Sequence, residues 1–196
     1  ITVGENAVIN IEVPEDLCGN VTVSVDGENY TVPVSGGKGT LVVPDLKEGD
    51  HTVDVTFDGC KKYEPAENST TFTVSKVETG DLNVIDLGNG TVVVTVPDNA
   101  TGTVEIKVGN NTYNATVKDG IATIDLVNET PGTYDIEVTY SGDESHTATN
   151  ATGTATIPKL ETPIDVTVEN IKVGDKETIV VTVPEDAKGN VTIEID

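Results

Sequence analysis

The feature that most constrains this chain is an internal repeat. The residues Val-Pro-Glu-Asp at 13–16 return as Val-Pro-Asp-Asn at 96–99, 83 positions later, and as Val-Pro-Glu-Asp at 183–186. A lysine-led segment at 76–79 returns at 159–162, again 83 positions later. Self-similarity at a fixed spacing is the signature of tandem structural units. The chain is therefore expected to fold as a row of similar small domains.

The repeat predicts where those domains begin and end. We expect a first unit at 1–75 that lacks its opening strand, a complete second unit at 76–158, and the start of a third at 159–196. Because the sequence begins with Ile1 and its last unit stops early, we expect it to be a piece of a longer protein.

Each unit shows a hydrophobic period of two. Val21, Val23 and Val25 alternate with Thr22 and Ser24, and the second unit repeats this alternation 83 positions later. Such alternation predicts strands with one buried and one solvated face. About seven short strands per unit, separated by Gly, Asp, Asn and Pro turns, are typical of a β-sandwich. The predicted fold class is therefore all-β.

Charge excludes several classes of partner. The formal net charge is −23, from 34 acidic and 11 basic residues, and all of the basic residues are lysine. A surface this acidic is unsuited to nucleic acid or to anionic lipid. The chain also has no apolar run near the roughly 20 residues of a membrane span. We therefore expect no nucleic-acid partner and no direct membrane insertion in this segment.

Two motifs carry a resemblance to a known family. The run Thr-Pro-Gly-Thr-Tyr-Asp-Ile-Glu-Val-Thr-Tyr-Ser-Gly-Asp at 130–143 resembles the late strands of bacterial-type immunoglobulin-like repeats of group 3 (Big) type. The element Val-Pro-Glu-Asp-x-x-Gly-Asn-Val-Thr, at 13–22 and 183–192, is similar to repeats in adhesin-like surface proteins of methanogenic archaea. The resemblance implies tandem immunoglobulin-like β-sandwiches at a cell surface. It also places Tyr134 at a corner-tyrosine position, which His51 occupies in the first unit.

The strongest chemical signal is an excess of N-glycosylation sequons. The pattern Asn-x-Thr occurs at 10 of the 15 asparagines, where chance placement gives on the order of 3. The alternative is that Asn opens strands and Thr fills their outward positions, which creates sequons without modification. We predict dense N-glycosylation. The sequon residues are Asn20, Asn29, Asn68, Asn89, Asn99, Asn110, Asn114, Asn128, Asn150 and Asn190.

The two cysteines are predicted to pair. Counting strands alternately up and down places Cys18 and Cys60 in loops at the same end of the first sandwich. An even number of cysteines in a secreted chain favours an intradomain disulfide and an oxidising compartment. Free thiols, an interchain link or a metal site are the alternatives.

Catalytic and metal signals are weak. His51 falls at an inward strand position, and His146 lies in a loop without a cysteine nearby. No known nucleophile, zinc or phosphate motif is present, so we predict a non-enzymatic protein without a catalytic or metal site. The acidic pairs at 15–16, 143–144 and 185–186 are candidates for Ca²⁺, although solvated turn carboxylates are the more common case. Tyr63, beside Lys61 and Lys62, is the only loop aromatic.

These features predict an extracellular, adhesin-like or surface-layer protein whose repeats form a glycosylated stalk. Its partners are expected to be neighbouring copies, or host or partner-cell surfaces reached through regions outside this sequence. One alternative is a filament subunit, in which the segment 163–169 of a neighbour completes the first unit as an added strand. Another is that the repeats are accessory modules of a large secreted enzyme.

Overall fold

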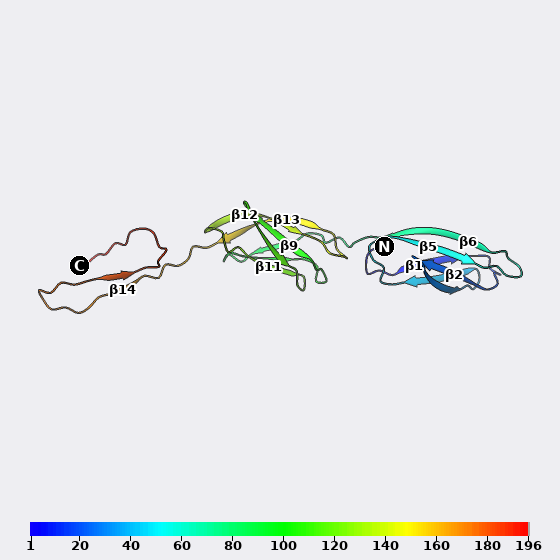
Figure 1. Ribbon diagram of the computed structural model, residues 1–196, viewed down its shortest axis with the longest axis horizontal. Coiled ribbons are helices and arrows are strands. Elements are labelled where there is room, and N and C mark those ends of the chain that lie inside the picture. Colours follow the sequence, from blue (N-terminus) through cyan, green and yellow to red (C-terminus); the bar gives the residue numbers. More distant parts are fainter. Residues whose placement is uncertain (196) are drawn as a thin grey trace. The chain divides into compact units, whose positions relative to one another are not determined.

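A computed structural model describes residues 1–195, and in this part of the chain every regular element is a β-strand. The chain divides into two compact units, Ile1–Ile157 and Pro158–Asp196. The strands of residues 1–75 and those of residues 76–157 form separate sheets, which we call the first and second sandwich (Figure 1). No helix in the described residues is long and apolar enough to cross a membrane.

The second sandwich has seven strands in two sheets, as predicted. One sheet has the order β11-β8-β7 and the other the order β10-β9-β12-β13, with all neighbours antiparallel. Two antiparallel sheets packed face to face are the architecture of immunoglobulin-like domains. The strands are β7 Asn83–Asp86, β8 Thr91–Thr95, β9 Thr103–Val108, β10 Asn111–Thr116, β11 Ile121–Asp125, β12 Gly132–Tyr140 and β13 Thr149–Ile157.

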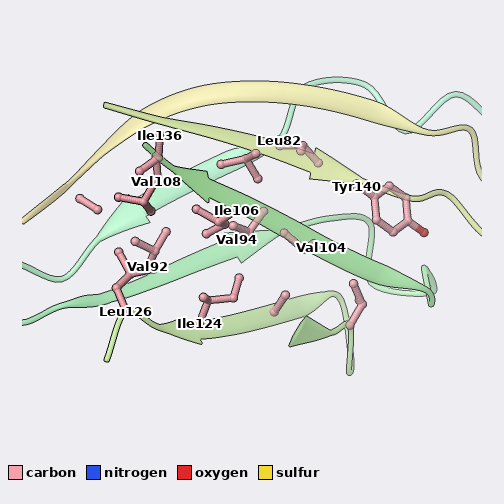
Figure 2. Close-up of a cluster of buried hydrophobic side chains, with 14 of the residues drawn as sticks. Leu82, Val92, Val94, Val104, Ile106, Val108, Ile124, Leu126, Ile136 and Tyr140 are labelled. Carbon is pink, nitrogen blue, oxygen red and sulfur yellow. The ribbon is translucent and has the colours of Figure 1, made fainter. Parts of the chain in front are cut away.

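The alternating residues of these strands make the core of the second sandwich (Figure 2). Val104, Ile106 and Val108 of β9 are buried, and the residues between them are not. Val92 and Val94 of β8 meet them from the other sheet, so the two apolar faces are hidden against each other. Burying each such side chain stabilises the fold by roughly 1.5–3 kcal/mol, which explains why the period-two pattern dictates the architecture.

The first sandwich repeats this plan with one strand fewer. Its four-stranded sheet has the order β3-β2-β5-β6, and its second sheet contains only β1 and β4. Each strand corresponds to one of the second sandwich 83 positions later, and β7 is the strand without a counterpart among the described residues. The strands are β1 Ala7–Glu12, β2 Asn20–Val25, β3 Glu28–Pro33, β4 Lys38–Val43, β5 Gly49–Phe57 and β6 Ala66–Val74.

The remaining unit contains one short antiparallel pair, β14 Asp165–Thr167 with β15 Val180–Thr182. Its pairing places Val166 opposite Val181, in the same relation as Val84 to Val94 between β7 and β8. The pair therefore has the register expected at the start of a third repeat. Most of its apolar side chains are exposed, including Leu160.

Candidate functional site

The pole of the first sandwich is closed by a disulfide. Cys18 lies in the loop before β2 and Cys60 in the loop after β5, and the structure joins them with a Cα–Cα distance of 6.1 Å. The predicted bridge is therefore present, and it encloses a sequence separation of 42 residues. A disulfide that closes a loop of this length stabilises the domain by about 4 kcal/mol, because it lowers the entropy of the unfolded chain.

The same pole of the second sandwich is closed by hydrogen bonds. Thr101 and Asp143 stand 83 positions after the two cysteines. Asp143 Oδ2 accepts hydrogen bonds from the Thr101 amide at 2.6 Å and from its hydroxyl at 3.1 Å. The loops share their backbone geometry as well, because Asp143 N donates to His146 O just as Cys60 N donates to Tyr63 O. A carboxylate thus links the two loops that a covalent bond joins in the first sandwich.

The side chain of Asp143 is buried although it lies in a loop, and its carboxylate accepts several hydrogen bonds. Its side chain is only 8% exposed. Oδ1 accepts from the amides of Ser145 at 2.8 Å and His146 at 2.6 Å, and the His146 ring nitrogen Nδ1 lies 3.0 Å away. Burial alone raises the pKa of such a group, but the N–H donors of Thr101, Ser145 and His146 outweigh it and hold the pKa well below its usual range. The carboxylate is therefore a structural acceptor that stays ionised.

The neighbouring aromatic and linker residues extend this pole. Tyr140 is fully buried at one end of the core, and its hydroxyl donates to Thr101 O at 2.6 Å (Figure 2). Burial raises the pKa of Tyr140 to about 12, so the hydroxyl stays protonated and can donate. Lys76 Nζ donates to Asp143 O at 2.6 Å, and Val77 N donates to Ser145 O at 2.7 Å. The lysine-led segment is thus held against the second sandwich.

The acidic pairs do not form a cation site in the described residues. No group of three or more His, Cys, Asp or Glu side chains between residues 1 and 195 is arranged to hold a metal ion. The Asp143 carboxylate accepts hydrogen bonds from backbone N–H donors, and such donors cannot serve as ligands of a cation. Asp16 contacts Lys62 and accepts a hydrogen bond from the Tyr63 hydroxyl. The geometry lends no support to the Ca²⁺ hypothesis.

Tyr63, the loop aromatic, also contacts neighbouring side chains. Besides its bond to Asp16, the Tyr63 ring has the Lys62 ammonium 5.2 Å from its centroid. Tyr63 and Lys62 lie in the same loop as Cys60, which the disulfide joins to Cys18. These contacts of the Tyr63 ring are made within the first sandwich.

His51 performs the corner role that the second sandwich gives to Tyr134. The Tyr134 hydroxyl donates to Thr130 O at 2.7 Å, four residues upstream. His51 Nε2 donates to Lys47 O at 2.9 Å, also four residues upstream, so the corner bond is kept despite the different residue. His51 Nδ1 then lies 2.5 Å from Asp26 Oδ2.

The corner pair perturbs two ionisations. The Asp26 carboxylate, followed by the Lys47 carbonyl, raises the pKa of His51, because an imidazolium can donate to both at once. The same hydrogen bond, with a second from the amide of Thr52, lowers the pKa of Asp26. The His51 ring also stacks on Phe72 at a centroid distance of 5.4 Å. Both ring nitrogens have partners, which makes His51 a structural residue.

All ten sequon asparagines have exposed side chains. Four of them lie on the outermost strands of the four-stranded sheets. Asn29 lies on β3 and Asn68 on β6, while Asn114 lies on β10 and Asn150 on β13. Every outer strand of these two sheets therefore carries one sequon at an accessible position, which the sequence pattern alone did not reveal.

Comparison with known proteins gives only distant structural similarities. No protein-family model matches the chain, and no curated protein matches it. Among solved structures it is similar to the BSP domain of a biofilm-associated protein, with 21% identity and a TM-score of 0.28, over 83% of this chain and 29% of that one. It is similar to a segment of titin, with 13% identity and a TM-score of 0.42, over 94% of this chain and 71% of that one.

A third similar structure is a Bacteroides ovatus protein from a mixed-linkage glucan utilization locus, in complex with a heptasaccharide. It has 15% identity and a TM-score of 0.29, with 76% of this chain and 40% of that chain covered. The chain spans well under two thirds of the biofilm-associated and Bacteroides proteins. The architecture is that of immunoglobulin-like domains, and a role must be argued from the chain's own residues.

Proposed function

We propose that this chain is a non-enzymatic stalk segment of an extracellular, adhesin-like or surface-layer protein, and that its sandwiches carry N-linked glycans. We also propose that the sandwiches are group 3 immunoglobulin-like repeats of an archaeal surface protein. The observation that carries the glycosylated stalk is that each outer strand of the two four-stranded sheets has an exposed sequon asparagine. Outer strands present unpaired N–H and C=O groups that invite aggregation, and a glycan beside them blocks such pairing.

Two further features support an extracellular role. The disulfide between Cys18 and Cys60 belongs to an oxidising compartment. The net charge of −23 makes neighbouring stalks repel one another and keeps them dispersed. Partners on host or neighbouring cells would be reached through regions outside this sequence.

The buried ionisable groups argue for structure over catalysis. Asp143, His146 and His51 all lie in hydrogen bonds that close a pole or a corner of their own sandwich. A general acid or base must instead present its proton to a substrate. The enzyme alternative therefore concerns domains beyond these residues, with the sandwiches as accessory modules.

The test is site-resolved glycan mapping of the protein from its natural source. Peptides containing Asn29, Asn68, Asn114 and Asn150 are compared before and after enzymatic or chemical removal of N-glycans. We expect occupancy at these outer-strand sites, seen as a loss of mass of each peptide when the N-glycans are removed. Unmodified peptides at all four sites would contradict the glycosylated stalk. A control is Asn83, an exposed asparagine outside any sequon.

A further inference from the structure

The sequon that begins at Asn99 is held in place by the pole of the second sandwich. Its Thr101 hydroxyl lies 3.1 Å from Asp143 Oδ2, and the Thr101 amide donates to the same oxygen. The middle residue, Ala100, is buried, and its amide donates to Pro97 O. The Asn99 side chain itself is exposed. The fold therefore leaves room for a glycan while it binds the hydroxyl that defines the sequon.

The sequon that begins at Asn89 is held in the same way. Its Thr91 hydroxyl donates to Asp125 Oδ1 at 2.8 Å, and the Thr91 amide donates to Asn89 Oδ1 at 3.0 Å. The amide of the middle residue, Gly90, donates to Thr156 O on β13. Each of the three residues of this sequon is thus engaged in a hydrogen bond of the folded domain.

A third sequon, at Asn128, is held at the tyrosine corner. Its Thr130 hydroxyl lies 2.7 Å from the Tyr134 hydroxyl. Because the Tyr134 hydroxyl donates to Thr130 O, the Thr130 hydroxyl is the donor between the two side chains. The middle residue, Glu129, accepts a hydrogen bond from the Tyr113 hydroxyl at 2.9 Å. We call these three sites the held sequons.

The other three sequons of the second sandwich differ in this respect. Their threonines are exposed, and within residues 1–195 their hydroxyls make no hydrogen bond to another side chain. We call them the free sequons. They begin at Asn110, Asn114 and Asn150, and their threonines are Thr112, Thr116 and Thr152.

We propose that the held sequons receive their glycans only before the second sandwich folds, whereas the free sequons remain acceptors afterwards. In the transfer a bond forms between the Asn Nδ2 atom and the first carbon of a sugar. The bond from that carbon to a phosphate oxygen of a lipid-linked donor breaks, and Nδ2 gives up a proton. This inference rests on the proposed glycosylation and adds the order of events at each site.

The physical reason is competition for the threonine hydroxyl. A transferase recognises its acceptor by the hydroxyl two residues after the asparagine, and a hydroxyl has a single O–H donor. In each held sequon that hydroxyl contacts a side chain from another part of the fold, namely Asp125, Asp143 or Tyr134. The enzyme can surround it only when these partners are apart, as they are in the unfolded chain.

Acceptor rates of the folded chain test this order. The whole chain is made without glycans, and a purified single-subunit oligosaccharyltransferase with a lipid-linked oligosaccharide is added after folding. Peptides spanning each sequon are the unfolded reference, which corrects for the neighbouring residues of each site. Relative to its peptide, each held site should react about tenfold more slowly than the free sites, because its hydroxyl must first be released. Equal relative rates at held and free sites overturn the proposal.

Single substitutions release one hydroxyl at a time. Asp125→Ala should raise the rate at Asn89 of the folded chain about fivefold and leave Asn99 unchanged. Asp135→Ala, at an exposed aspartate of β12, is the matched control and should change neither site. A melting temperature near that of the unmodified chain shows that a variant is folded. A rate at Asn89 that does not rise in folded Asp125→Ala overturns the proposal.

A second release variant covers the corner site. Tyr134→Phe frees the Thr130 hydroxyl and should raise the rate at Asn128 about fivefold, again without changing Asn99. An unchanged rate at Asn128 in the folded variant counts against the proposal in the same way.

Site occupancy of the natural protein separates this inference from the proposed function. We expect glycans at held and free sites alike, which together with slow transfer to the folded held sites means that these were modified before folding. Held sites that are empty while free sites are occupied overturn the inference and leave the glycosylated stalk standing. A natural protein without glycans at any site overturns the proposed function itself.

Discussion

The two sandwiches close the same pole by different chemistry. In the first, Cys18 and Cys60 form a covalent bridge. In the second, Thr101 and Asp143 occupy the matching positions and are joined by hydrogen bonds to a buried carboxylate. The loop after the long strand keeps the same backbone bond in both. Both sandwiches thus link these two loops, one through a disulfide and the other through an ionised hydrogen-bond acceptor.

The largest expected effect comes from removing the disulfide. Cys18→Ser combined with Cys60→Ser should destabilise the first sandwich by about 4 kcal/mol, because the unfolded chain regains the entropy of an open loop. Scanning calorimetry of the whole chain should resolve this as a lowered transition for one sandwich. A reductant should have the same effect on the unmodified chain and none on the transition of the second sandwich. A reductant that lowers both transitions equally would contradict the comparison.

Neutralising the carboxylate should have the next largest effect. Asp143→Asn replaces an acceptor oxygen by an amide that confronts N–H donors, and hydrogen bonds to charged groups are worth about 1.5–3 kcal/mol. We expect a loss of about 2 kcal/mol in the second sandwich, measured by urea unfolding. Glu144→Gln, at the exposed neighbour, is the matched control and should change little. Equal effects of the two substitutions would show that Asp143 is not the tie.

The two sandwiches should respond to pH in different ways. The lowered pKa of Asp143 gives the second sandwich stability that is present above the unfolded pKa of about 4 and is lost as the pH falls through the lower folded value. The raised pKa of His51 gives the first sandwich stability that is present below about pH 6.5 and is lost as the pH rises through the folded value.

Melting temperatures recorded from acid to mild alkali measure both slopes. Only the transition of the first sandwich should fall on the alkaline side, and His51→Tyr should remove that fall while keeping the corner hydrogen bond seen at Tyr134. If the alkaline slope persists in His51→Tyr, another group is responsible for it.

The smallest net effect is expected from transplanting the bridge. Thr101→Cys combined with Asp143→Cys should form a disulfide in the second sandwich, because the two loops have the same separation in sequence. The gain of about 4 kcal/mol is offset by the lost carboxylate network, so the net change should be a gain of about 1–2 kcal/mol. Thiol titration and urea unfolding together give the answer. A gain near the full value would mean that the carboxylate contributes little.

Much of the fold could be predicted because it follows from the period of two. Val104, Ile106 and Val108 each occupy a position that repetition and alternation mark as inward, and burial of apolar area decides the rest. The Cys18–Cys60 bridge could also be predicted, since counting strands assigns both loops to one end.

The ties at the pole and corner could not be predicted in the same way. An aspartate in a loop is usually solvated, and the burial of Asp143 depends on three amides converging from two loops. His51 replaces the corner tyrosine in the first sandwich, and the sequence does not show that its Nε2 donates to the carbonyl of Lys47 in the same way. The one sequence signal for this link is the 83-residue offset, which aligns Thr101 with Cys18 and Asp143 with Cys60.

The disulfide also determines how far the first sandwich can be stretched. When a stalk is pulled from its ends, an unfolded domain lengthens by about 3.4 Å for each residue released. The bridge removes the 42-residue interval between Cys18 and Cys60 from the extensible chain, which shortens the slack by about 140 Å. The loops of the second sandwich are linked only by hydrogen bonds, so all of its residues become extensible once its strands separate. Two similar domains in one chain therefore differ in how far each can extend after it unfolds.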